Sequence, residues 1–194
     1  MEPGFTYKIE DIRLIEILRK EFYDHKKDFH PNRGKQNYEK YLGTIEENNI
    51  GGWKGSFWEN HKELFYYLNE KTYPQDPEYI LDKSWMKYYP KGAFSGLHTE
   101  NADASVGEDQ YTNVILIDQA EDIVGGVIVI AGDSIEPDYK NPNKKENIRE
   151  RLITKFLKDP GDSIVWNGKT VHGVSKIEKG HRLVFVCTKT KMER

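Results

Sequence analysis

The sequence has very little cysteine: its 194 residues contain a single one, Cys187. One cysteine allows neither an internal disulfide nor a cysteine metal cluster. A reducing, cytoplasmic setting is therefore the expectation. Any transition metal in this chain would have to be held by histidine and carboxylate side chains.

Long hydrophobic runs and an excess of one charge are also missing. The longest apolar run, near residues 124–131, is far shorter than the roughly 18 residues that a membrane span needs. The N-terminal residues lack the basic flank and apolar stretch of a signal peptide. The net charge is -3, from 29 basic and 32 acidic residues without a long block of either sign. We therefore expect no membrane partner, and the acidic balance argues against nucleic acid.

What the sequence does have is aromatic residues, which make up 12% of a chain whose hydrophobic content is only 37%. The aromatic content argues against disorder, because the aromatic rings supply core area that the aliphatic residues do not. The length predicts one structural domain. The oligomeric state cannot be derived from the sequence.

The first 84 residues have helical features. Ile12, Ile15, Leu18 and Phe22 recur at helical spacing, and that helix should end before the turn-rich residues 30–34. The stretch Ser56-Phe-Trp-Glu59 is a capping box, which predicts a second helix. One face of that helix would hold Phe57, His61, Leu64 and Leu68. We expect residues 1–84 to be a helical segment packed on the rest of the chain.

Residues 85–194 have the pattern of short strands separated by glycine and proline turns. Strands are predicted at Tyr111–Ile117, Val124–Ile130, Ser163–Trp166 and Leu183–Thr188. A surface loop is expected at Asp133–Lys145, a short helix at Glu146–Leu157 and a turn at Asp159–Asp162. The predicted fold class is α+β: a double-stranded β-helix, or cupin-like jelly roll, with N-terminal helices packed on it.

Two short motifs contain candidate metal ligands. In His98-Thr99-Glu100 the imidazole and the carboxylate point to the same side of a strand. His172 follows the strand predicted at Ser163–Trp166. Each motif alone is usually structural. Together they supply the two histidines and one carboxylate that bind iron(II) and leave positions open for a co-substrate and O₂.

Arg182 lies ten positions after His172, across the turn Glu178-Lys-Gly180. That turn folds the next strand back beside the previous one, so the guanidinium could grip a carboxylate at a fixed distance from the metal. An isolated arginine is more often part of a surface ion pair. Next to a two-histidine, one-carboxylate set, the carboxylate clamp is the better interpretation.

These residues give the chain a resemblance to the iron(II)/2-oxoglutarate-dependent dioxygenases, in particular the prolyl 4-hydroxylase-like and bacterial PKHD-type branch. The resemblance covers roughly residues 85–189. Its motifs follow one another in the family's order: Tyr89-Pro-Lys-Gly92, His98-Thr-Glu100, Gly125-Gly126, Pro160-Gly161 and His172-Gly-Val…Gly180-x-Arg182.

The resemblance implies an iron(II) site made by His98, Glu100 and His172, with 2-oxoglutarate and O₂ as co-substrates. It implies that Arg182 binds the distal carboxylate of 2-oxoglutarate and that Tyr89, or Tyr88 in a shifted register, contributes to the same site. Asn113 is a further candidate contact, unless strand alternation turns Thr112 and Val114 inward instead. Trp166 and Val174 are pocket wall or core.

The chain departs from the family pattern at two places. Glu100 stands where the closest relatives have aspartate, and its presence argues against a halogenating member. After Arg182 the sequence lacks the second arginine of the alkylated-base demethylases, which makes nucleic-acid demethylation a minor alternative. The expected activity is hydroxylation of an unactivated C–H bond in a small-molecule or peptide substrate, prolyl or amino-acid-like, with release of succinate and CO₂. The rival is a cupin-like binding protein or isomerase for a small acid or sugar, for which Arg182 has no evident role.

Overall fold

The computed structural model describes residues 4–32, 37–46, 49–54, 56–99, 110–131 and 152–192. In chain order the elements are β1 (Phe5–Lys8), α1 (Ile12–His25), a 3-10 turn η1 (Lys26–Asp28), β2 (His30–Pro31), β3 (Tyr38–Glu46), β4 (Asn49–Lys54), α2 (Ser56–Asn60), α3 (Lys62–Lys71), β5 (Tyr79–Tyr89), β6 (Ser95–His98), β7 (Gln110–Gln119), β8 (Val124–Gly125), β9 (Ile128–Ala131), β10 (Leu152–Lys155), β11 (Asp162–Asn167), β12 (His172–Val174), β13 (Ile177–Lys179) and β14 (Arg182–Lys191). None of the described helices is long and apolar enough to cross a membrane.

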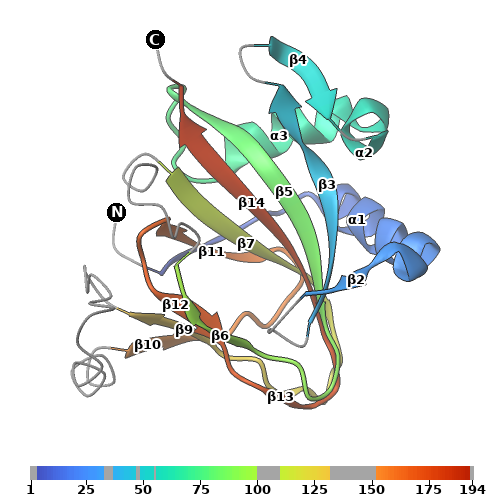
Figure 1. The fold of residues 1–194 in the computed structure, drawn as a ribbon, viewed down its shortest axis with the longest axis vertical. Coiled ribbons are helices and arrows are strands. Elements are labelled where there is room, and N and C mark those ends of the chain that lie inside the picture. Colours follow the sequence, from blue (N-terminus) through green and yellow to red (C-terminus); the bar gives the residue numbers. More distant parts are fainter. Residues whose placement is uncertain are drawn as a thin grey trace.

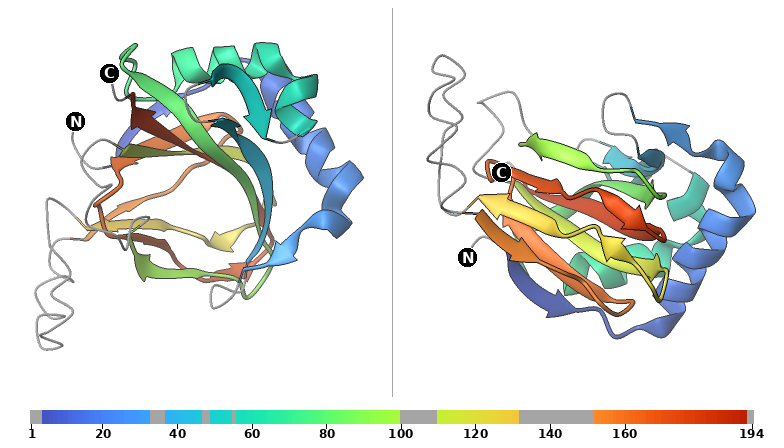
Figure 2. Two further views of the ribbon diagram at one scale, coloured as in Figure 1. Left: turned by 45° about the horizontal axis from the view of Figure 1, so that its top comes forward. Right: turned by 90° about the horizontal axis from the view of Figure 1, so that it is seen from below.

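Two antiparallel sheets face each other and enclose the interior of a barrel (Figure 1). The large sheet has the strand order β1-β11-β7-β14-β5-β3-β2, with β4 added beside β3. The small sheet has the order β10-β9-β12-β6, and β13 pairs with β8 in a short ribbon. Figure 2 shows the two sheets curving around the interior, with the helices outside the large sheet. This is the predicted double-stranded β-helix.

The central strands β7 and β14 of the large sheet are buried on both faces, and alternation divides their side chains between two cores. On β7, Val114 and Leu116 belong to the cluster inside the barrel, whereas Ile115 and Ile117 belong to the cluster under the helices. On β14, Val184 lies inside and Phe185 outside. Side chains alternate along a strand. Once one residue is known to face the interior of the barrel, its two neighbours in the strand must face the helices.

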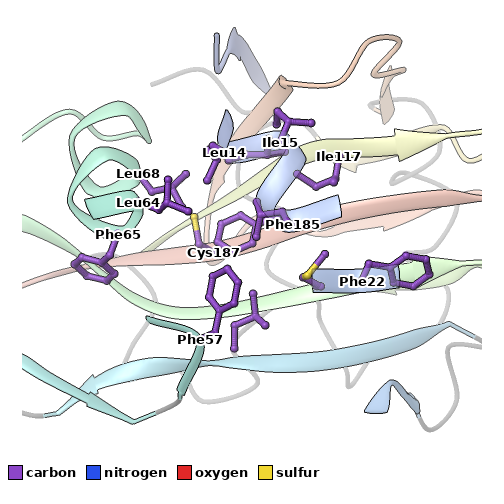
Figure 3. Packing of buried hydrophobic residues seen from close by; sticks show 14 of the residues in the cluster. Leu14, Ile15, Phe22, Phe57, Leu64, Phe65, Leu68, Ile117, Phe185 and Cys187 are labelled. Carbon is purple, nitrogen blue, oxygen red and sulfur yellow. The ribbon is translucent and has the colours of Figure 1, made fainter. Parts of the chain in front are cut away.

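The helices cover the outer face of the large sheet. Helix α1 begins at the N-cap Asp11, whose carboxylate accepts a hydrogen bond from the main-chain N–H of Arg13 at 2.9 Å. Its buried side chains are Leu14, Ile15, Leu18 and Phe22. Three of the four predicted positions are thus confirmed, but Ile12 is exposed and Leu14 takes its place in the buried stripe. Figure 3 shows α1 and α3 residues packed against Ile117, Phe185 and Cys187 of the sheet.

The first 84 residues are less helical than the sequence predicted. Four strands lie in this part, and β1 and β3 extend the large sheet at opposite ends by pairing with β11 and β5. The predicted second helix is broken at His61 into α2 and α3. A boundary after residue 84 falls inside β5, so the two parts of the chain share one strand. The aromatic residues of β3 pack across strands, as Tyr41 does on Trp85, so the sequence of this strand lacks a clear alternation of apolar and polar residues.

Later in the chain, the four predicted strands are all present, as β7, β8 with β9, β11 and β14. The predicted turn before β11 is also present, where Gly161 has φ 90° and the Asp162 carboxylate accepts hydrogen bonds from two main-chain N–H groups. The predicted helix at 146–157 is wrong for its described part, because Leu152–Lys155 is β10, paired with β9. The predicted loop at 133–145 lies outside the described residues.

Candidate active site

The interior of the barrel contains a small cavity that opens to solvent. The described residues that line it come from both sheets, and their side chains are mainly apolar. The polar or aromatic ones are Lys87, Tyr89, Ser95, His98, Trp166, His172 and Arg182. Three of the residues that the sequence singled out, His98, His172 and Arg182, therefore share one cavity.

His98 and His172 lie directly opposite each other on β6 and β12. Their ring centroids are 4.5 Å apart. His172 is buried and also contacts Trp166, with ring centroids 4.4 Å apart, whereas His98 is half-buried. Strand pairing thus brings together two imidazoles that are 74 positions apart in the chain.

Each imidazole is oriented by a main-chain carbonyl two residues before it. Nδ1 of His98 lies 2.7 Å from the carbonyl oxygen of Gly96, and Nδ1 of His172 lies 3.0 Å from that of Thr170. A carbonyl oxygen only accepts hydrogen bonds, so Nδ1 is the protonated atom of each neutral ring. Nε2 then holds the lone pair that a metal ligand needs, an arrangement typical of metal-binding histidines. The two rings therefore fit a transition-metal ion.

Glu100, the predicted third ligand, lies outside the described residues, as do most of residues 101–110 that follow it. Among the described residues, no third histidine, cysteine, aspartate or glutamate completes a metal-binding group with the two histidines. Glu100 therefore stays a prediction of the sequence.

Arg182 enters the same cavity from the first position of β14 and is 1% exposed. Its Nε and Nη2 donate to the side-chain oxygen of Gln119 at 3.2 and 2.9 Å. Nη1 donates to the carbonyl of Gly126, and Nη2 also donates to that of Leu157. Burial lowers the pKa of Arg182 to about 10, which leaves the guanidinium charged at neutral pH. The structure thus holds a cation rigidly inside an apolar barrel.

Tyr89, rather than Tyr88, is on the cavity side of β5. Tyr89 is 4% exposed, lines the cavity and lies directly opposite Arg182 in the β5–β14 pair. Tyr88 points to the helices, where its ring centroid is 4.8 Å from that of Phe22. The register that the sequence left open is settled by alternation along β5.

Asn113 is not among the described residues that line the cavity, which favours the alternative that strand alternation turns its neighbours inward. Its side-chain oxygen accepts hydrogen bonds from the Tyr7 hydroxyl at 2.7 Å and the Tyr73 N–H at 3.0 Å. Its amide nitrogen donates to the Tyr73 carbonyl at 2.7 Å. Val114, the next residue, lines the cavity instead. Asn113 is thus a tie between the sheet and the segments around Tyr7 and Tyr73.

Trp166 is a wall of the cavity, one of the two alternatives that the sequence left open. Its indole Nε1 is buried and has no hydrogen-bond partner among the described residues. The same is true of the hydroxyl of Thr112, its cross-strand neighbour. A buried donor without an acceptor costs about 1–3 kcal/mol. An unpaired buried N–H group beside His172 is typical of a site that binds a polar ligand.

Three further residues belong to this site that the sequence did not predict. Gln119 orients Arg182, the ring of Phe156 stacks on the guanidinium at 4.7 Å, and Lys87 lines the cavity. Nothing marks Gln119 or Phe156 in the sequence, because their roles depend on strand pairing. Lys87 had a signal, since it lies two positions before Tyr89 and so shares its face of the strand.

Several solved structures resemble this chain, among them one from Burkholderia pseudomallei described as an oxidoreductase of the 2OG-Fe(II) oxygenase family. HygX from Streptomyces hygroscopicus, solved with nickel and 2-oxoglutarate bound, has a TM-score of 0.68 at 12% identity, over 98% of this chain and 84% of that one. A prolyl-4-hydroxylase from Pseudomonas putida has a TM-score of 0.62 at 12% identity, over 100% and 95%. The chain has the fold of the 2-oxoglutarate–iron(II) oxygenases.

A further structure with this fold is a prolyl hydroxylase from Trichoplax adhaerens, in complex with a peptide fragment of a hypoxia-inducible factor. Its TM-score is 0.60 at 9% identity, over 95% of this chain and 82% of that one. No protein-family model and no curated protein matches the sequence. The similarity is therefore one of fold, and the activity has to be argued from the site.

Proposed function

We propose that this protein is an iron(II)- and 2-oxoglutarate-dependent dioxygenase that hydroxylates an unactivated C–H bond and releases succinate and CO₂. The observation that supports this most is the placement of the His98–His172 pair and of Arg182 in one cavity of this fold. A histidine pair suits iron(II), and a buried guanidinium suits the distal carboxylate of a 2-keto diacid.

Each residue has a distinct role in this proposal. His98 and His172, with Glu100 as the third ligand, hold iron(II) and leave positions open for 2-oxoglutarate and O₂. Arg182 binds the distal carboxylate, and Tyr89 beside it forms the wall of the co-substrate site. Bound iron supplies O₂ activation coupled to the oxidative decarboxylation of 2-oxoglutarate.

The protein orients and shields this chemistry. The carbonyls of Gly96 and Thr170 hold the imidazoles in the tautomer that presents Nε2. Gln119 holds the guanidinium of Arg182 in place. The apolar side chains of Val114, Ile128, Val184 and Val186 keep bulk water from the space between these groups.

For the substrate, we propose a prolyl, peptidyl or amino-acid-like molecule. Two lines of support are the sequence resemblance to the prolyl 4-hydroxylase-like branch and the prolyl hydroxylases among the structures that share the fold. Fold similarity alone is a weak guide to the substrate, so the test is a direct screen.

The screen measures succinate formation with 2-oxoglutarate, iron(II) and O₂ across free amino acids and proline-containing peptides. We expect succinate to form in step with one class of substrate and to be lost in the His172→Ala variant. A cupin-like binding protein or isomerase would show neither succinate nor O₂ uptake with 2-oxoglutarate. That result with a metal-loaded, folded protein would contradict the proposal.

A further inference from the structure

Lys87 lines the cavity from the middle of β5. Alternation puts it on the same face as Trp85 and Tyr89, which both belong to the apolar cluster inside the barrel. Its ammonium lies 5.9 Å from the centroid of the Trp85 ring. Of the described residues that line the cavity, Lys87 and Arg182 are the permanent cations, and none is acidic.

Strand register places Lys87 between Arg182 and the histidines. Tyr89 lies opposite Arg182, and Lys87 lies opposite Val184, one inward-facing position further along β14. Lys87 and Arg182 are thus diagonal neighbours, whose Cα atoms lie on the order of 7–8 Å apart. Thr188 is the second inward-facing residue after Val184 on β14. It pairs with Thr112 on β7, and Thr112 pairs in turn with Trp166 on β11.

The ring of Trp166 contacts His172, so this row marks the level of the histidine pair. A molecule that reaches from the histidines to Arg182 therefore passes the level of Lys87.

Arg182 has little hydrogen-bonding capacity left for a ligand. Gln119 and the carbonyls of Gly126 and Leu157 take up most of its N–H groups. An ammonium, by contrast, brings three N–H donors on a flexible stem. A carboxylate at this end of the cavity would gain most from a second cation next to the guanidinium.

We propose that Lys87 is a second anion-binding residue of this site, whose ammonium holds the distal carboxylate of 2-oxoglutarate together with Arg182. This inference rests on the proposed function. It adds an ion-pairing contact from Lys87 to that of Arg182, whose guanidinium also ties β14 to Gln119 and to the carbonyls of Gly126 and Leu157.

The competing explanation is an ion pair with Glu39, which lies opposite Lys87 on β3. The Glu39 carboxylate accepts a hydrogen bond from the Asn32 side chain at 2.8 Å. The hydrogen bonds and ion pairs of the described residues include none between this carboxylate and the Lys87 ammonium. Glu39→Gln is therefore the matched control, because it removes that carboxylate and keeps the contact with Asn32.

The experiment measures equilibrium binding of two keto acids to the nickel-loaded protein, followed by tryptophan fluorescence. One is 2-oxoglutarate, and the other is 2-oxobutanoate, which has the same keto acid end without the distal carboxylate. We expect Lys87→Met to weaken 2-oxoglutarate binding by about 10- to 100-fold, the range for losing a charged hydrogen bond. The dissociation constant for 2-oxobutanoate should change by less than about threefold, which is the usual size of an indirect effect from a residue that does not contact the ligand.

Lys87→Arg should retain most of the affinity, and Glu39→Gln should bind 2-oxoglutarate like the wild type. If Lys87→Met does not fold, Lys87→Gln replaces it. Equal binding of 2-oxoglutarate by wild type and Lys87→Met would overturn this inference alone. Equal weakening of both keto acids, or an equal loss in Glu39→Gln, would also overturn it. Failure of the wild type to bind 2-oxoglutarate would instead overturn the proposed function.

Discussion

His98 and His172 face each other from hydrogen-bonded strands, and the Nδ1 atom of each is held by the carbonyl oxygen two residues before it. The local chain and the strand register therefore fix the two rings independently of any ligand. Such preorganisation is what a metal site needs, since the ligands do not have to be ordered when the ion binds.

Replacing either histidine should abolish metal binding. We expect His172→Ala and His98→Ala to weaken nickel binding by more than about 100-fold, because losing even an outer-shell partner of a metal ligand costs 10- to 100-fold. His181→Ala is the control, because His181 lies on the other side of the sheet next to Asp118, 3.6 Å away. Titration calorimetry with nickel measures the effect. Unchanged binding by His172→Ala would remove this residue from the site.

Gln119 should act as a positioning residue for Arg182. Gln119→Leu removes the oxygen that accepts from both Nε and Nη2. The guanidinium then loses its orientation, and we expect the KM for 2-oxoglutarate to rise by roughly tenfold while kcat changes little. Gln119→Glu, which keeps an acceptor oxygen, should recover part of the loss. A fall in kcat with KM unchanged would show that Gln119 has another role.

Asn113 should matter for stability and not for the co-substrate. Asn113→Ala leaves the Tyr7 hydroxyl and the Tyr73 main chain without their buried partner, which should cost about 1–3 kcal/mol in the free energy of unfolding. Burial raises the pKa of the Tyr7 hydroxyl, so it remains a donor at any neutral pH. Urea unfolding measures the loss. A raised KM for 2-oxoglutarate without a loss of stability would contradict this assignment.

Cys187 should make the protein less stable at alkaline pH. Burial raises the pKa of its thiol from 9.0 to about 12. Between these values the unfolded chain loses the proton and the folded chain keeps it. Stability contributed by the buried thiol is therefore complete below pH 9 and falls by about 1.4 kcal/mol per pH unit above it.

The measurement for Cys187 is the free energy of unfolding at pH 8 and pH 10, compared with that of Cys187→Ala. Burial lowers the pKa of Lys189 to about 8, so this lysine titrates in the same interval and interacts with the thiol. The difference in slope between the two proteins therefore reports the thiol together with its interaction with Lys189. The wild type should lose more stability than the variant over this interval. Equal losses would mean that the thiol ionises in the folded protein as it does in the unfolded chain.

The sequence predicted the second half of the fold well, because glycine and proline turns there mark where each strand begins and ends. Gly161 and Gly180 mark bends with positive φ, and the strands after them contain the apolar runs Ile164–Trp166 and Leu183–Cys187. The first half has helical features in its sequence because α1 carries a clear apolar stripe. In β3 the alternating pattern is blurred by aromatic residues on both faces, and only pairing with β5 shows that Tyr38–Glu46 is a strand.

For the site, the sequence identified the residues whose chemistry is rare and missed those that act through pairing. His98, His172 and Arg182 were found from their types and spacing. The alternatives for Asn113 stayed open because a strand buried on both faces gives no indication of which face is the interior. Lys87 and Gln119 depend on the register between β5, β7 and β14, which contacts far apart in the sequence determine.

The most direct test of the central claim is an anaerobic titration of the protein with iron(II) and 2-oxoglutarate, followed by visible absorption. The account predicts a weak charge-transfer band that needs both components, saturates at one equivalent of each, and is lost in His172→Ala. Its loss on adding O₂ should coincide with succinate formation. No band in the folded wild type, or a band that His172→Ala retains, would contradict the account.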